Sequence, residues 1–256
     1  MKISNRASAP VWADLSATDV PAAKAFYEGL FGWSADEAPS EEAGGYGMFV
    51  LAGKQVGGFG PCMSPEAPTA WLVYFQVDDA DAVATKVTQN GGTVVAAPMD
   101  VLDAGRMAVF TDPEGAVFGV WQPREHTGFG VIDEPGSVCW FELMARDSDK
   151  AKSFYAAVFG WEGQTNPAGP SEYTEWQLDG TSFSGMMRMN EDFPPELPAH
   201  WMVYVAVEDC DAAAARATEL GGKVGVPPTD VPPGRFCIIN DPQGGTISLI
   251  ALSEGH

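Results

Sequence analysis

The stretch from Val11 to Trp33, VWADLSATDVPAAKAFYEGLFGW, decides how this chain is organised, because it occurs twice. It returns from Cys139 to Trp161 as CWFELMARDSDKAKSFYAAVFGW, and each shared residue is displaced by the same 128 positions, as Trp12 is to Trp140. Spacing held over so many aromatic, acidic and glycine positions is the signature of an internal repeat. The sequence is therefore an internal duplication.

Further matches continue to the end of each half. Tyr74 corresponds to Tyr204 at an offset of 130. The closing segments GRMAVFTDPEG (105–115) and GRFCIINDPQG (234–244) correspond at an offset of 129. Because the offset changes by at most two residues, the two halves differ only by short loop changes.

The composition is that of a globular protein with a strongly acidic surface. The 256 residues are 45% hydrophobic, enough for two modest domains that each bury a core. A formal charge of −21 argues against nucleic acid or an anionic membrane as a partner, since both require basic surfaces. The four cysteines stand singly, and no signal peptide or membrane-spanning run is evident. We expect a soluble cytoplasmic protein with a small-molecule partner; the sequence does not indicate an oligomeric state.

The repeated stretch itself predicts a strand followed by a helix. Residues 10–18 alternate between two faces, as a strand requires. Asp19 is suited to cap the N-terminus of the helix, and Gly32 is suited to end it. Phe26 and Tyr27 belong to the apolar stripe of that helix.

The same order of elements recurs later in each half. A second alternating strand precedes Asp79 and Asp81, and either residue could cap a second helix that Gly91-Gly92 closes. Further strands are expected at 46–52, 55–60, 93–97, 106–111 and 116–121. Loops are expected at 36–45, 163–172 and 227–228. Each half is therefore a strand–helix–strands unit used twice, which gives four units in all.

These units predict an α+β fold of four βαβββ units paired into two domains. Domain 1 covers residues 1–124 and domain 2 covers residues 136–256. The segment 125–135 between them is polar, contains glycine and proline, and is interpreted as a linker.

Four βαβββ units in two pairs resemble the vicinal oxygen chelate superfamily, which includes glyoxalase I, bleomycin-resistance proteins, fosfomycin-resistance enzymes and extradiol dioxygenases. The resemblance covers nearly the whole chain and depends on the motifs FY-x-x-x-[LV]-FGW and GR…DP-x-G in each half. The tandem layout is most similar to glyoxalase-like proteins that include a mycobacterial antigen and the so-called hydroxylases of actinomycete antibiotic clusters. The resemblance implies curled mixed sheets around clefts that hold the chemistry.

The resemblance also implies where a metal would be held. In metal-dependent members a His, Gln or Glu precedes the helix-capping acid by seven residues, the spacing of Trp12 and Asp19 here, and a Glu follows the DP-x-G turn. The corresponding residues of this chain are Trp12, Leu72, Trp140, Met202, Gly119 and Ser248. None of them is a plausible ligand of a divalent cation, so we expect no metal and no other cofactor.

The strand face that carries each of these tryptophans also carries an acid. By strand parity Asp14 lies beside Trp12 and Glu142 beside Trp140, opposite the face that packs on the helix. We expect a tyrosine and an arginine from neighbouring strands to complete one set in each half. The two sets are Trp12, Asp14, Tyr74 and Arg106, and Trp140, Glu142, Tyr204 and Arg235.

Three interpretations of these sets remain open. The clefts could bind a small planar or hydrophobic metabolite or drug without a metal, as bleomycin-resistance members sequester a drug. The protein could instead be a lyase or isomerase, with Asp14 or Glu142 as general base and Arg106 or Arg235 stabilising an oxyanion. Each acid and arginine could also form a structural ion pair between strands. The sequence does not identify the ligand, nor decide whether a reaction is catalysed or whether both halves function.

Overall fold

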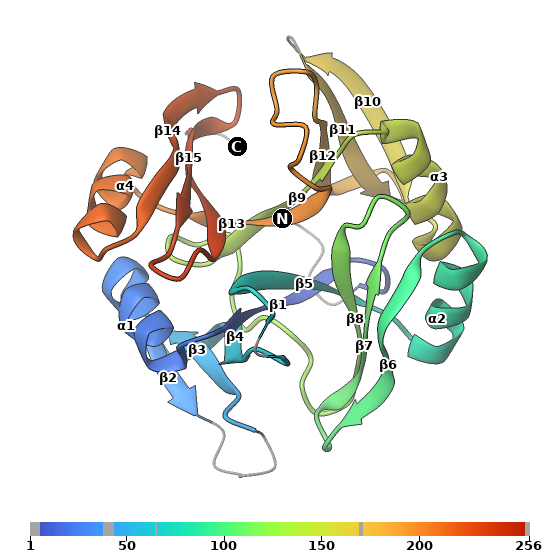
Figure 1. Ribbon diagram of the computed structural model, residues 1–256, viewed down its shortest axis with the longest axis horizontal. Helices are drawn as coiled ribbons and strands as arrows, with labels where there is room; N and C mark the ends of the chain where they lie inside the picture. Colours follow the sequence, from blue (N-terminus) through green and yellow to red (C-terminus); the bar gives the residue numbers. More distant parts are fainter. Residues whose placement is uncertain (1–5, 38–43, 65, 169–170, 254–256) are drawn as a thin grey trace. The chain divides into compact units, whose positions relative to one another are not determined.

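The computed structural model describes residues 6–37, 44–64, 66–168 and 171–253 and has an α+β fold (Figure 1). It contains two mixed sheets of eight strands, in the orders β2-β3-β4-β1-β5-β8-β7-β6 and β10-β11-β12-β9-β13-β16-β15-β14. The second order is the first with every strand number raised by eight. The fold thus confirms the internal duplication and the α+β class.

Each half of the sequence supplies two βαβββ units. The first half contains β1 (Pro10–Ala17), α1 (Val20–Phe31), β2 (Ser34–Glu37), β3 (Gly47–Leu51), β4 (Lys54–Pro61), β5 (Ala70–Gln76), α2 (Ala80–Gln89), β6 (Thr93–Val101), β7 (Gly105–Thr111) and β8 (Val117–Pro123). The second half contains β9 (Val138–Ala145), α3 (Ser148–Phe159), β10 (Glu162–Ala168), β11 (Ser171–Leu178), β12 (Thr181–Arg188), β13 (His200–Ala206), α4 (Cys210–Glu219), β14 (Lys223–Val231), β15 (Gly234–Asn240) and β16 (Thr246–Leu252).

Helix boundaries follow from local capping. Asp19 precedes α1 and its side chain accepts a hydrogen bond from the backbone N–H of Ala22, as an N-cap does. Gly32 ends the same helix with φ of 70°, a left-handed conformation that glycine adopts without a steric penalty. Of the two candidate caps for α2, Asp79 is the one that bonds the first turn. No helix among the described residues is long and apolar enough to cross a membrane.

Three predicted loops turn out differently. The segment 163–172 lies largely in the strands β10 and β11. It was predicted to be a loop because its residues are mostly polar. Pro227-Pro228 lies inside β14, where the pairing with β15 is irregular, and an outer strand of a sheet tolerates proline at such a position. The expected acidic loop begins within β2, and its residues 38–43 lie outside the described residues.

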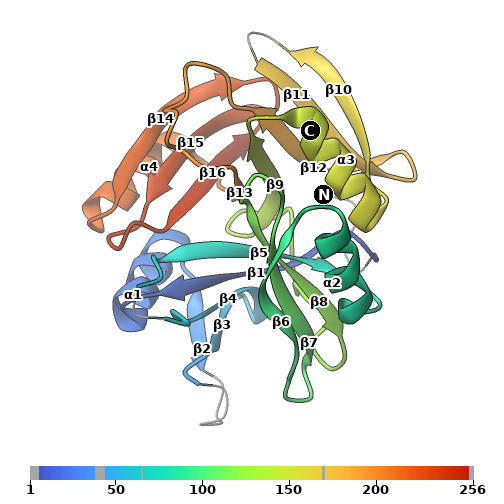
Figure 2. The same cartoon turned by 45° about the vertical axis from the view of Figure 1, so that its right-hand side comes forward.

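The chain forms two compact units, and each combines segments of both sequence halves. Unit 1 consists of residues 1–12, 72–128 and 140–202, and unit 2 of residues 13–71, 129–139 and 203–256. In unit 1 the helices α2 and α3 contact each other, with α2 along β6 to β8 and α3 against β10 and β12 (Figure 2). In unit 2 the contacting helices are α1 and α4. The compact units therefore divide the chain differently from the sequence repeat.

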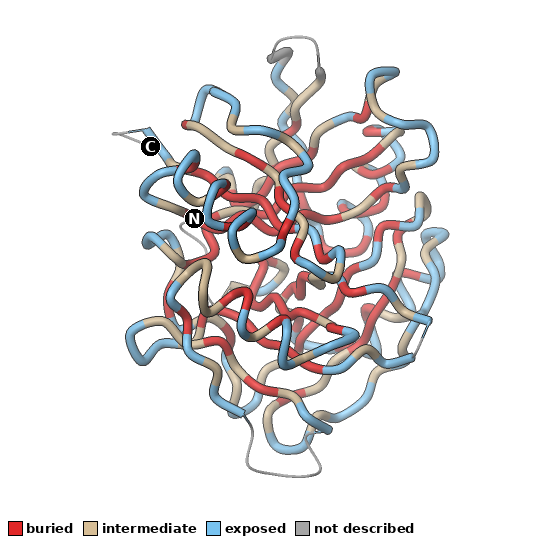
Figure 3. Tube along the Cα trace, turned by 60° about the vertical axis from the view of Figure 1, so that its left-hand side comes forward, coloured by how far each residue is buried: buried red, intermediate tan, exposed pale blue. Residues whose placement is uncertain are grey.

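Aromatic side chains fill the core of each unit. In unit 1 Tyr155 of α3 stacks on Trp161 at a centroid distance of 5.0 Å, and in unit 2 Tyr27 of α1 stacks on Trp33 at 6.0 Å. Trp33 and Trp161 are 4% and 2% exposed, so the tryptophan of each FGW motif belongs to the core. Figure 3 shows the buried residues gathered along the strands, with exposed residues mostly in turns and on outer helix faces.

Candidate functional site

The first acid, Asp14 of β1, is bonded to a tyrosine on the neighbouring hairpin. Tyr46 Oη donates a hydrogen bond of 3.1 Å to Asp14 Oδ2. Asp14 stands in parallel register with Gly58 of β4. A Cβ atom at Gly58 would lie 2.0 Å from the Tyr46 hydroxyl oxygen, so only glycine leaves room for this hydroxyl. Asp14 is 9% exposed, and its carboxylate is therefore held in place with little solvent around it.

The second acid, Glu142 of β9, has the same surroundings. Glu142 pairs with Gly185 of β12, and a Cβ there would again lie 2.0 Å from a tyrosine hydroxyl, that of Tyr173. Tyr173 hydrogen-bonds Glu142 and accepts a bond of 3.1 Å from Trp140 Nε1. Burial and the negative charge of Glu142 raise the pKa of Tyr173, so its hydroxyl stays protonated and can donate to the carboxylate.

We name this feature the acid–tyrosine–glycine arrangement: Asp14, Tyr46 and Gly58 in the first half, and Glu142, Tyr173 and Gly185 in the second. It lies on the sheet face opposite the helix. The glycines are in register with Met48 and Glu175, and the next residue along each strand, Phe49 or Trp176, packs on Tyr27 of α1 or Tyr155 of α3. Tyr46 and Tyr173 were not among the residues predicted from the sequence. Their common offset of 127, which the two glycines share, was the available signal.

The two tryptophans, Trp12 and Trp140, each contact further polar or aromatic side chains. Trp140 donates to Tyr173, as described above. Trp12 is 4% exposed and meets the edge of the His126 ring at a centroid distance of 4.5 Å. Trp121 Nε1 donates a hydrogen bond of 2.8 Å to the backbone carbonyl of His126. Burial lowers the pKa of the His126 imidazole. The aromatic surroundings in the first half are therefore partly supplied by the segment that the sequence marked as a linker.

Tyr74 and Tyr204, the two tyrosines predicted from the sequence, lie beside the last strand of each half. Tyr74 stands in register with Gly119, and its ring occupies the space that a Cβ at Gly119 would need, at 2.3 Å. Tyr204 stands in register with Ser248. Both tyrosines are less than a tenth exposed.

The residues at the metal-ligand positions of the superfamily do not fit a metal. The ring of Tyr74 fills the space above Gly119, where the resemblance places a glutamate ligand. The Trp140 indole nitrogen is an N–H donor committed to Tyr173, and indole offers no lone pair to a cation. Within the described residues no three His, Cys, Asp or Glu side chains are grouped so that they could hold an ion.

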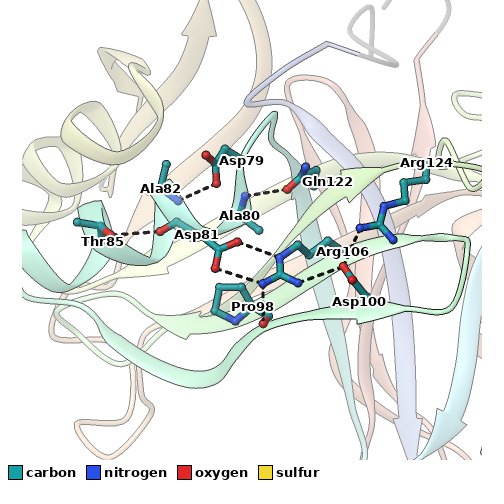
Figure 4. Close-up of polar contacts among 10 residues, drawn as sticks. All are labelled: Asp79, Ala80, Asp81, Ala82, Thr85, Pro98, Asp100, Arg106, Gln122 and Arg124. Atoms are coloured by element: carbon teal, nitrogen blue, oxygen red, sulfur yellow. Dashed lines mark hydrogen bonds and ion pairs between the residues drawn. The ribbon is translucent and has the colours of Figure 1, made fainter.

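The predicted arginines are engaged elsewhere, as Figure 4 shows for the first half. Arg106 binds Asp81 of α2 through Nε at 2.9 Å and Nη2 at 3.2 Å, and Asp100 of β6 through Nη1 at 3.1 Å. The hydrogen bond from Arg106 lowers the pKa of Asp100. Because Asp81 lies in the first turn of α2, the guanidinium group is on the helix-covered side of the sheet.

Arg235 repeats these contacts in the second half, with Nε at 2.6 Å from Asp211 of α4 and Nη1 at 2.8 Å from Asp230 of β14. The ion pairs considered from the sequence were between these arginines and Asp14 or Glu142, whereas the pairs described here join each arginine to a helix and a hairpin. Asp14 and Glu142 are instead joined to tyrosines.

The repeated βαβββ units and the order of their strands define a tandem glyoxalase-like fold. The chain belongs to the Glyoxalase/Bleomycin resistance protein/Dioxygenase superfamily: the model of that family matches residues 10–120, and the model of the glyoxalase-like domain matches residues 140–250.

Two relatives are similar over nearly the whole chain. CFP32 of Mycobacterium tuberculosis is 41% identical over 96% of this chain and 95% of that protein. The anthracycline biosynthesis protein DnrV of Streptomyces peucetius is 39% identical over 97% and 94%. A solved structure, the Mn(II)-bound glyoxalase from Novosphingobium aromaticivorans, is similar with a TM-score of 0.65 at 17% identity, over 96% of this chain and 82% of that one. That likeness shows the fold alone.

Proposed function

We propose that this protein binds a small planar or hydrophobic organic molecule, without a metal, on the sheet face that carries the acid–tyrosine–glycine arrangement. The observation that carries the proposal is the repeated bond from a tyrosine hydroxyl to an almost buried carboxylate, Tyr46 to Asp14 and Tyr173 to Glu142. A glycine beneath each hydroxyl leaves room for the tyrosine to lie close over the strand. Such a surface offers contact area for a ring system and two polar groups that orient it.

The relatives support a ligand of this class. DnrV is named for anthracycline biosynthesis, and an anthracycline carries a flat fused-ring system. Tryptophan and tyrosine rings beside each acid supply the large apolar surface that such a ring system needs. A phenol or hydroxyquinone edge could then donate its proton to Asp14 or Glu142, a charge-assisted hydrogen bond.

The test uses 2-naphthol, a flat neutral molecule with one hydroxyl donor. We expect it to bind the native chain, and Asp14→Asn together with Glu142→Gln should weaken binding about tenfold, since charge-assisted bonds are roughly twice as strong as neutral ones. Glu125→Gln, an exposed change in the linker, should leave affinity unchanged. Failure of 2-naphthol and similar fused-ring compounds to bind would contradict the proposal.

A second candidate function is proton abstraction next to a carbonyl, as in a lyase or isomerase. It is favoured by the proximity of a carboxylate that could act as base and a protonated tyrosine that could donate to an oxyanion, here Glu142 and Tyr173. In this scheme the carboxylate takes the proton from carbon and becomes neutral, and the tyrosine hydroxyl turns its one proton from the carboxyl group to the enolate oxygen. Arg106 and Arg235 have no part in it, because acids of the helices hold them.

The two functions differ in a simple measurement. A proton-abstracting enzyme exchanges the α-hydrogen of a bound α-hydroxyketone for deuterium in D₂O, and Glu142→Gln with Asp14→Asn would abolish the exchange. A binding protein takes up the molecule without exchange. Added EDTA should change neither the affinity nor the exchange rate, since the residues present do not fit a metal.

A further inference from the structure

Three neighbouring strands of unit 1 place two carboxylates in one row. Glu142 of β9 is in register with Gly185 of β12, and Gly185 is in register with Glu175 of β11. Residues in register on adjacent strands point to the same face of a sheet. Trp176, the next residue after Glu175, packs on Tyr155 of α3 with a centroid distance of 5.6 Å. Glu175 therefore lies on the opposite face, with Glu142.

The hydroxyl of Tyr173 lies above the glycine between these two acids. A Cβ at Gly185 would lie 2.0 Å from that hydroxyl. The charges of both Glu142 and Glu175 act on Tyr173 and help to raise its pKa, after the larger effect of burial. Two negative charges thus face one aromatic ring, and Trp140 lies next to it through its bond to the same hydroxyl.

Glu175 is held in position by neutral groups. Ser182 Oγ donates a hydrogen bond of 2.5 Å to Glu175 Oε2. Gln177 Nε2 in turn donates to Ser182 Oγ at 3.3 Å. Across the described part of the chain, no lysine or arginine forms an ion pair with Glu175. Its negative charge is therefore oriented but not neutralised by a basic side chain.

The first half has a different residue at the same place. There the row is Asp14, Gly58 and Met48, from the pairings of β1 with β4 and of β4 with β3. Met48 is the counterpart of Glu175 at the offset of 127 that also relates Tyr46 to Tyr173. The duplicated arrangement thus has one carboxylate in the first half and two in the second.

We propose that Glu175 determines ligand charge: the second-half site takes a flat aromatic compound that carries a positive charge, such as a ring with an amine or quaternary nitrogen, whereas the first-half site takes a neutral one. This inference depends on the proposed function, because it assigns specificity to the same face. An aromatic cation gains from two carboxylates and from the faces of Trp140 and Tyr173 together. A neutral ring gains only from the aromatic contact.

The experiment compares 1-methylquinolinium with 1-methylnaphthalene, which have nearly the same shape and differ by one positive charge. Binding to the full chain is measured by NMR titration. Glu175→Met copies the first half and should weaken quinolinium binding roughly five- to tenfold, with less than a twofold change for methylnaphthalene. Met48→Glu copies the second half and should strengthen quinolinium binding.

Glu196→Met is the matched control, because it removes one negative charge from an exposed position of the same unit. It should leave both affinities within twofold, which separates a local effect from attraction by the net charge of −21. Equal loss of quinolinium affinity in Glu175→Met and Glu196→Met would overturn the inference and leave the proposed function standing. Failure of both probes to bind the native chain would overturn the two together. Thermal unfolding of each variant shows that the fold is kept.

Discussion

The hydroxyl of Tyr27 donates a hydrogen bond of 3.0 Å to Asp241, a residue 214 positions later in the chain. The same hydroxyl accepts a bond of 2.9 Å from Trp71 Nε1. Unit 1 contains the equivalent contacts, in which Tyr155 donates to Asp112 at 3.2 Å and accepts from Trp201 at 2.9 Å. The FY motif of one sequence half therefore meets the DP-x-G turn of the other half inside each compact unit.

Removing the Tyr27 hydroxyl should destabilise the protein. Tyr27 is fully buried, and Tyr27→Phe leaves Asp241 and Trp71 each short of one partner. We expect the free energy of unfolding to fall by about 1.5–3 kcal/mol, the range for hydrogen bonds to charged groups. Denaturant unfolding of Tyr27→Phe, Asp241→Asn and the double variant measures the interaction energy between the two side chains. Losses of unfolding free energy that add strictly would show that the two side chains do not interact.

These cross-half bonds also predict how fragments behave. A fragment of residues 1–124 retains Tyr27 but lacks Asp241, and a fragment of residues 125–256 retains Tyr155 but lacks Asp112. Neither fragment should show the cooperative thermal unfolding of the full chain, and mixing the two should restore it. The measurement is near-ultraviolet circular dichroism during heating. A single fragment that unfolds cooperatively at the Tm of the full chain would show that a sequence half is self-sufficient.

The fold was largely predictable from local patterns. Asp19, Gly32 and the alternation of residues 10–18 act over a few residues, and they fixed a helix and a strand close to the observed bounds. The partner of Tyr27 was not predictable, because Asp112 and Asp241 stand in identical motifs and only tertiary packing selects between them. Because the chain is duplicated, the sequence alone does not distinguish a partner in the same half from one in the other half.

Strand parity in the sequence places both acids and Trp140 on one sheet face, and their role as binding or catalytic residues stays a prediction. Tyr173 was missed because it directly follows the expected loop 163–172 and no strand was predicted for residues 173–178, which lie in β11. Arg106 was assigned to the ligand side, but Asp81 in the first turn of α2 attracts its guanidinium to the helix side. A sequence does not reveal which face a residue near the start of a strand adopts when a turn precedes it.

The Arg235 ion pairs predict a pH dependence of stability. The hydrogen bond from Arg235 lowers the pKa of Asp211 in the folded state. An Asp whose pKa is lower in the folded state stabilises the protein at pH values above its unfolded pKa of about 3.9. This stabilisation is lost as the pH falls through the folded-state pKa. The Tm of Asp211→Asn should therefore lie below that of the native chain at pH 7, and the difference should vanish in acid. A difference that persists below about pH 2 would contradict this assignment.

Thiol reactivity should separate the four cysteines. Cys62 is partly exposed, whereas Cys139, Cys210 and Cys237 are buried. Burial raises the pKa of Cys139 to about 12 and also raises those of Cys210 and Cys237, so all three stay protonated near neutral pH. We expect one fast-reacting thiol with an aromatic disulfide reagent in the native protein and four after unfolding. Cys62→Ser should abolish the fast phase; a second fast thiol would show that a buried position opens readily.

Both tyrosines of the proposed site should contribute to the position of its acids. Tyr173 accepts from Trp140 and bonds Glu142, so Tyr173→Phe leaves an indole donor and a carboxylate each without that partner. Tyr46→Phe removes the corresponding bond to Asp14.

We expect Tyr173→Phe to lower the free energy of unfolding by about 1–2 kcal/mol, since the hydrogen bonds of a buried hydroxyl are lost. Denaturant unfolding measures this effect. In 2-naphthol binding, each variant should lose affinity, because the orientation of its carboxylate is no longer fixed. Unchanged affinity in both variants would show that the tyrosine hydroxyls do not position the acids and that the proposed site lies elsewhere on the sheets.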